Sequence, residues 1–148
     1  MTQDSYGQFC PVAMAAEVLC NRWTMVLLRE LVCGSTRFNE FRRGVPRMSP
    51  ALLSKRLREL EDAGIVRRVA SSVEPGVLGY HLTRSGRDFR PMIGIWGQRW
   101  VDSSPSLQNL DADLLTWDMR RSVNVSRFPR RRTVIEFLFQ KISAWPAV

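Results

Sequence analysis

The sequence predicts a mainly α-helical chain that carries one small β-hairpin. An amphipathic pattern over residues 50–63 predicts a helix, which a Ser-Pro pair opens and Gly64 closes in the left-handed conformation. Three shorter helical patterns precede it within residues 11–43. Two strand-like segments, residues 65–70 and 80–82, follow it on either side of a Glu-Pro-Gly turn.

Each of the three upstream helices has its own start or stop signal. Pro11 suits the first turn of the first helix, which runs to Leu19. The second helix covers about residues 23–32 and ends at a glycine, and the third covers residues 37–43. The apolar faces are expected to consist of Val12, Ala15, Ala16 and Leu19 in the first helix, Trp23, Val26, Leu27 and Leu31 in the second, and Phe38 and Phe41 in the third, after a Ser35-Thr36 cap.

The helix over residues 50–63 shows the strongest pattern. Leu53, Leu57 and Leu60 recur at steps of four and three, so they share one buried face. The opposite face carries small, hydroxyl and charged side chains, namely Ala51, Ser54, Lys55, Arg58 and Asp62. Such a face can approach the base edges of a DNA major groove and donate hydrogen bonds to guanine and phosphate oxygens. The same pattern also fits an amphipathic surface helix with a solvated basic face.

The order of the elements specifies a motif. The third helix and the helix over residues 50–63 are joined by a Gly-Val-Pro turn, which is typical of a helix-turn-helix. Three helices followed by a β-hairpin form a winged helix. Thr83 then caps a long helix to about Asp102, whose apolar stripe consists of Phe89, Met92, Ile93, Trp96 and Trp100. This stripe is large for an exposed helix, so it predicts a homodimer interface, although it could also pack on its own domain.

The charge of the chain indicates an anionic partner. The formal net charge is +8, and residues 37–68 hold nine Arg and Lys against four acids. Clustering of positive charge around a helix-turn-helix pattern favours double-stranded DNA over a membrane surface.

Other function classes find little support in the sequence. The N-terminus lacks the apolar core of a secretory signal, no segment is long enough to span a membrane, and the three cysteines lack metal-site spacing, so we expect a cytoplasmic protein without metal or cofactor. His81 is the single histidine, and no phosphate loop or carboxylate pair indicates an enzyme. Arg29 and Glu30 are helix neighbours, so they are not expected to face each other, and Glu30 is expected to meet another helix.

Residues 9–103 resemble the HxlR family of bacterial winged-helix transcriptional regulators, which are related to the MarR group. The motifs that carry the resemblance are Cys10-Pro11-Val12, Arg22-Trp23-Thr24 with Leu28-Arg29-Glu30-Leu31, Arg37-Phe38-Asn39-Glu40-Phe41, Ser49-Pro50 with residues 53–60, and Tyr80-His81-Leu82-Thr83 with Gly86. The resemblance implies a homodimer whose recognition helices enter successive major grooves. The residues expected to face DNA are Arg37, Arg47, Ser49, Pro50, Ala51, Ser54, Lys55, Arg58, Arg67 and Arg68.

Two features depart from or extend that pattern. The wing tip, residues 71–79, lacks the usual basic residue and carries Glu74, so Arg67 and Arg68 at the base of the wing are expected to hold phosphate instead. Cys10 precedes a helix start, where backbone N–H groups favour a thiolate, and it matches the reactive cysteine of some relatives. Cys10 is therefore either a redox sensor or a small packing residue, whereas Cys20 and Cys33 are expected in the core.

The sequence divides into a DNA-binding domain, residues 1–103, and a short extension, residues 104–148. Residues 114–121 and the strand-like residues 133–139 resemble the start of a sterol-carrier-protein-like domain, too short to close its cavity, so we expect an incomplete α+β tail. The alternative function is therefore a small-molecule or lipid-responsive binding protein that acts through this extension.

Overall fold

The computed structural model describes residues 5–71, 74–100, 111–129 and 131–138. The chain forms two compact units, residues 1–103 and 104–148, and each is described by itself. In the described part of the chain, no helix is long and apolar enough to cross a membrane.

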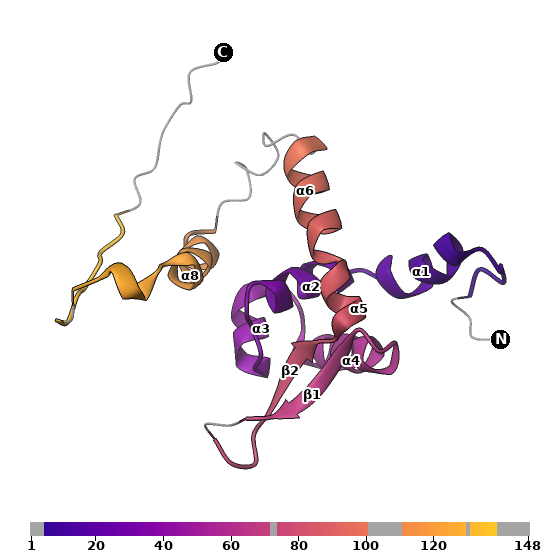
Figure 1. The fold of residues 1–148 in the computed structure, drawn as a ribbon, viewed down its shortest axis with the longest axis horizontal. Coiled ribbons are helices and arrows are strands. Elements are labelled where there is room, and N and C mark those ends of the chain that lie inside the picture. Colours follow the sequence, from indigo (N-terminus) through magenta and orange to yellow (C-terminus); the bar gives the residue numbers. More distant parts are fainter. Residues whose placement is uncertain (1–4, 72–73, 101–110, 130, 139–148) are drawn as a thin grey trace. The chain divides into compact units, whose positions relative to one another are not determined.

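The first unit contains six helices and one hairpin in its described residues (Figure 1). Their bounds are α1 Pro11–Leu19, α2 Thr24–Val32, α3 Phe38–Gly44, α4 Pro50–Asp62, β1 Val66–Ala70, β2 Leu78–Leu82, α5 Arg84–Asp88 and α6 Arg90–Trp100. The two strands pair antiparallel from Val66 opposite Leu82 to Ala70 opposite Leu78. The predicted helical chain with one hairpin is thus confirmed, although β1 begins one residue later and β2 two residues earlier than expected.

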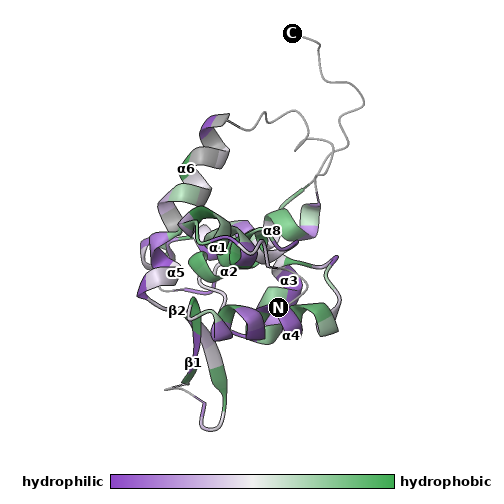
Figure 2. Cartoon of the chain, turned by 90° about the vertical axis from the view of Figure 1, so that its right-hand side faces the viewer, coloured by the Kyte–Doolittle hydropathy of each residue, from purple (hydrophilic) through white to green (hydrophobic). Residues whose placement is uncertain are grey.

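The core lies between α2, α3, α4 and the base of the hairpin. Its buried apolar side chains are Leu27, Leu28, Leu31, Phe41, Val45, Met48, Leu53, Leu57, Leu60, Ile65 and Val66. Figure 2 shows α4 with both hydrophilic and hydrophobic bands, as the leucine spacing predicts for an amphipathic helix. Phe41 meets Tyr80 edge-to-face with ring centroids 6.0 Å apart, which ties α3 to β2. The backbone N–H of Tyr80 also donates to the carbonyl of Thr36 at 2.8 Å.

The buried face of α2 differs in part from the predicted one. Thr24, Leu27, Leu28 and Leu31 are buried, at the spacing of one helical face, whereas Val26 is 39% exposed. The helix begins after Trp23, which adopts a left-handed φ of 78°. Trp23 is half-buried and packs against the core as predicted, whereas Val26 falls outside the buried face, which Thr24 and Leu28 join instead.

Glu30 is a charged residue at full burial in this core. Contrary to the prediction, it forms an ion pair with its neighbour Arg29, because the long arginine side chain can fold back along the helix. Its other carboxylate oxygen accepts from the hydroxyl of Ser35 at 3.1 Å. The carboxylate also lies against Gly44 of α3, so Glu30 does meet another helix as expected.

Helix boundaries account for three further corrections. The N-cap of α3 is Arg37 rather than the Ser35-Thr36 pair, since Glu40 Oε2 accepts from the backbone N–H groups of Thr36 and Arg37 at 2.7 and 2.9 Å. Cys20 and Cys33 are exposed rather than in the core, because they are the C-cap residues of α1 and α2.

The third correction concerns the long helix after the hairpin. Thr83 caps it as predicted, but the helix is interrupted at Phe89. Pro91 has no N–H for the carbonyl of Arg87, and its ring crowds that carbonyl, which disfavours a continuous helix. Residues 101 and 102 of the expected helix lie outside the described residues.

The second unit contains α8, Ala112–Ser122, and a 3₁₀ turn, η1, Val125–Arg127. Asp111 caps α8 by accepting from the N–H groups of Asp113 and Leu114 at 3.0 and 3.1 Å. The strand expected at residues 133–139 is absent from its described part, residues 133–138. A strand requires a hydrogen-bonding partner, and no other strand of this unit is found in its described residues.

Candidate nucleic-acid interface

The outer face of α4 is fixed by how the helix is anchored. Ser49 Oγ accepts from the N–H of Leu52 at 3.3 Å, and Pro50 occupies the first turn. At the other end Gly64 adopts the left-handed φ of 69° that the sequence predicts. With Leu53, Leu57 and Leu60 buried, the opposite side of α4 is exposed, and it carries Ala51, Ser54, Lys55 and Arg58.

The cations of α4 differ in their partners. Arg58 forms no hydrogen bond or ion pair within the described residues. Lys55 Nζ lies 3.8 Å from Glu59 Oε1, an exposed pair one helical turn apart, and such pairs contribute little. Arg56 is mostly buried and bonds Glu59 on the flank of the helix. Arg58 and Lys55 are therefore the α4 cations that an incoming anion can recruit at low cost.

A basic groove of about 640 Å³ adjoins the start of α4. It is lined by Asn39, Arg42, Arg43, Pro46, Arg47, Met48, Ser49 and Pro50. Of the predicted DNA-facing residues, the structure brings Arg47, Ser49 and Pro50 together here. Asn39, Arg42 and Arg43 were not predicted. Their spacing of three and four places them on one face of α3, so a helical projection of that segment would have found them.

The basic residues in and next to the wing differ in whether they pair with an acid. Arg68 Nε donates to Glu61 Oε1 at 2.9 Å, and Arg37 Nη1 donates to Glu74 Oε2 at 2.8 Å. The hydrogen bond and charge of Arg37 hold the pKa of the Glu74 carboxyl below its ordinary value. Arg67 forms no ion pair within the described residues. Two of the predicted cations, Arg37 and Arg68, are thus already neutralised by acids of the same chain.

Replacing Glu74 by glutamine is expected to release Arg37 and to strengthen DNA binding on all sequences alike. One more phosphate contact should make the slope of log affinity against log salt more negative by about one. Fluorescence anisotropy on a labelled duplex at several salt concentrations measures that slope. Asp88→Asn is the matched control, because Asp88 is exposed and loses the same charge without releasing a cation. Equal effects of both variants would show that only net charge matters.

The predicted interface residues lie at the junction of α5 and α6 and along α6. Phe89 is half-buried and packs on its own core, whereas Met92 is 66% exposed. The side chains of Ile93, Trp96 and Trp100 lie outside the described residues. Ile95, which the predicted stripe omits, is 63% exposed.

Cys10 is exposed at the N-cap of α1, where the backbone N–H groups of Ala13 and Val12 hold the pKa of its thiol below the ordinary value.

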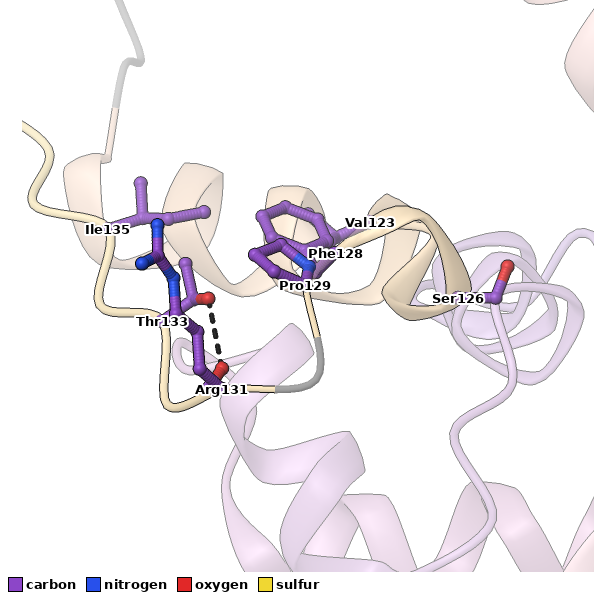
Figure 3. A pocket seen from close by; sticks show the side chains of 7 residues that line it. All are labelled: Val123, Ser126, Phe128, Pro129, Arg131, Thr133 and Ile135. Carbon is purple, nitrogen blue, oxygen red and sulfur yellow. Dashed lines mark hydrogen bonds between the residues drawn. The ribbon is translucent and has the colours of Figure 1, made fainter.

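The second unit holds an open pocket of about 620 Å³. It is lined by Val123, Ser126, Phe128, Pro129, Arg131, Thr133 and Ile135. Figure 3 shows Phe128 next to Pro129, and the dashed line marks the hydrogen bond from Thr133 Oγ1 to the carbonyl of Arg131 at 3.2 Å. The lining is mainly apolar with one cation, which is chemistry suited to an amphipathic anion.

Helices α3 and α4, their short turn and the following hairpin define a winged helix-turn-helix protein. The model of the HxlR-like helix-turn-helix matches residues 18–105. The HTH-type transcriptional regulator YdeP of Bacillus subtilis is 34% identical over 102 residues, covering 67% of this chain and 80% of YdeP. The chain therefore belongs to the HxlR-like helix-turn-helix family.

Two solved structures resemble the first unit. The crystal structure of PA1607 matches with a TM-score of 0.59 at 29% identity and covers 66% of this chain and 70% of PA1607. The redox regulator HypR in its reduced form matches with a TM-score of 0.55 at 33% identity and covers 68% of this chain and all of HypR.

Proposed function

We propose that this protein is a transcriptional regulator that binds double-stranded DNA with α4 in the major groove. The observation that carries the proposal is the exposed face of α4, with Lys55 and Arg58 beside small residues, next to the basic groove of Arg42, Arg43 and Arg47. Ala51 and Ser54 leave room for close approach to the base edges, and Arg and Lys are the usual readers of guanine. Membership in the family and the name of YdeP support this function.

Selection from a random-sequence duplex pool tests the proposal. The protein is expected to enrich a discrete sequence, and its affinity for that duplex should fall steeply with salt as phosphate contacts release counterions. A shuffled duplex of equal length is the control. Equal affinity for both duplexes at physiological salt would contradict sequence-specific binding.

We further propose a homodimer formed through α6 and the N-terminal segment. Phe9 is fully exposed, and Val12, Met92 and Ile95 are each more than 60% exposed. Burying a large apolar side chain contributes about 1.5–3 kcal/mol, so such side chains are expected to be covered by a second copy.

The dimer is expected to give twice the mass of the chain in light scattering at micromolar concentration. Ile95→Asp should shift that mass towards the monomer, because an interface position would then carry an unpaired buried charge. Leu78→Asp, which alters an exposed apolar residue of the wing, is the matched control. A monomeric wild type would overturn the proposal.

Cys10 is proposed as the residue that senses oxidants. Its exposed thiol has a lowered pKa, and the redox regulator HypR is 33% identical to this chain. The thiolate would attack a peroxide oxygen, giving a sulfenic acid and releasing hydroxide. The sulfenic acid would condense with a thiol to a disulfide and release water. Modification beside the dimer segment would then change the spacing of the two α4 helices.

The pH dependence of alkylation tests the state of Cys10. In a Cys20→Ser/Cys33→Ser background, the rate of reaction with iodoacetamide should reach half its maximum at a lower pH in the folded protein than in urea. The reason is that folding supplies the N–H groups that stabilise the thiolate. In the same background, peroxide should alter DNA affinity, and the further change Cys10→Ser should remove that response. Equal midpoints in both states and no response to peroxide would leave Cys10 as a packing residue.

A second candidate function is small-molecule or lipid binding by the extension, residues 104–148, with its resemblance to the start of a sterol-carrier-protein-like domain. The pocket around Phe128 and Arg131 favours it. Calorimetry with a short-chain fatty acid is expected to show saturable binding that Arg131→Gln weakens, while Arg120→Gln does not. Absence of saturable binding would contradict this function.

A further inference from the structure

A separate cavity of about 330 Å³ lies beside the wing in the first unit. Four of its lining residues are apolar and three are basic: Leu31, Val32, Val69 and Leu82, and Arg67, His81 and Arg87. They come from the end of α2, from both strands of the hairpin and from α5, so three parts of the fold meet here (Figure 1).

The hairpin register aligns two of the basic groups. Arg67 lies directly opposite His81 in the antiparallel pair, so their side chains share one face of the sheet. Val69 is two residues along β1 and lies on that same face. Arg87 reaches the cavity from α5, and its Nη1 donates to the carbonyl of Leu82 at 3.1 Å. That bond anchors the guanidinium and leaves its other N–H donors free for a ligand.

The lining selects the charge of the occupant. None of the residues that line the cavity is Asp or Glu. Within the described residues, Arg67, His81 and Arg87 form no ion pair with a carboxylate. Because no carboxylate accompanies Arg67, His81 and Arg87, the cavity is expected to be electropositive. Arginine side chains bind carboxylates with two parallel hydrogen bonds, which is a favourable geometry for a carboxylate ligand.

The apolar residues of the lining favour a ligand that has an apolar part. The cavity also has an apolar surface, formed by Leu31, Val32, Val69 and Leu82. An inorganic anion has no apolar part that could cover this surface and exclude water from it. A volume of about 330 Å³ is at the lower end for small-molecule sites. We propose that this cavity binds a small organic carboxylate with a compact apolar body, held by Arg67, His81 and Arg87.

A bound carboxylate would also affect the wing. Such a ligand would bridge Arg67 of β1 and Arg87 of α5, fixing the hairpin relative to the helix that precedes α6. It would also neutralise Arg67, which is a proposed phosphate contact. The ligand would therefore weaken DNA binding, and this consequence alone rests on the proposed function.

Calorimetry of the full chain without DNA tests the site itself. Benzoate is the probe, and benzamide, acetate and inorganic phosphate are the comparison ligands. Benzoate is expected to bind saturably, with the three others at least about tenfold weaker, because each lacks either the charge or the apolar body. Arg67→Gln and Arg87→Gln should each weaken benzoate binding about tenfold. Arg120→Gln removes an equivalent exposed charge from the second unit and should leave benzoate binding unchanged.

Three results would overturn the site. They are no saturable benzoate binding by folded wild type, benzoate binding no tighter than phosphate or acetate, and equal binding by the Arg67→Gln and Arg87→Gln variants. Circular dichroism confirms that each variant is folded. The DNA readout is separate: benzoate should lower affinity for the selected duplex in wild type and not in Arg87→Gln. Benzoate binding without any DNA binding would contradict the proposed function while leaving the site intact.

Discussion

Replacing Lys55 and Arg58 together by alanine is expected to abolish sequence-specific DNA binding while the fold remains intact. Both side chains are exposed on the face of α4 opposite the buried leucines, so their loss removes no packing. Each cation that contacts a base is worth about 1–3 kcal/mol, so the double variant should lose at least about 2 kcal/mol, which is about thirtyfold in affinity. Anisotropy titration with the selected duplex measures the loss.

The control for that variant removes the same charge elsewhere. Arg120→Ala/Arg127→Ala takes two exposed cations from the second unit and should change affinity little. Testing Lys55→Ala and Arg58→Ala singly against duplexes with one altered base pair separates the two roles. A base contact relaxes preference at one position, whereas a phosphate contact weakens every sequence equally. Unchanged affinity in the double variant would remove α4 from the interface.

Gly44→Ala is expected to destabilise the first unit strongly. A methyl group on Gly44 would lie 2.0 Å from Glu30 Oε2 and 2.1 Å from its Cδ, closer than atoms can approach. Glu30 is fully buried and is held by Arg29 and Ser35, so it cannot swing aside without leaving a buried charge unpaired. Overpacking of this kind costs about 1–3 kcal/mol or more in free energy of unfolding.

Urea unfolding followed by circular dichroism measures the effect of Gly44→Ala. Gly94→Ala is the matched control, since nothing lies within 4 Å of the added methyl group and alanine favours a helix interior by about 1 kcal/mol over glycine. The first variant should lower the midpoint and the second should keep or raise it. Equal midpoints in the two variants would mean that α3 can move away from Glu30 freely.

The local signals in the sequence were sufficient for the helices that carry the candidate site. The cap at Ser49, the left-handed Gly64 and the buried leucines of α4 were all predicted, because capping and helical periodicity depend on residues within one or two turns. The interruption at Phe89 also has a local cause. Pro91 was visible in the sequence, and its missing N–H would have predicted the end of α5.

The partners of the charged residues depended on the tertiary structure. Arg37 and Glu74 are 37 residues apart, and only the docking of the wing on α3 brings them together. Glu30 is buried beside Gly44 because α2 and α3 pack closely at that point. The sequence by itself thus determined α1 to α4, the hairpin and the basic face of α4. The tertiary structure decided which cations remain free, because an ion pair between distant segments has no periodic or capping signal in the chain.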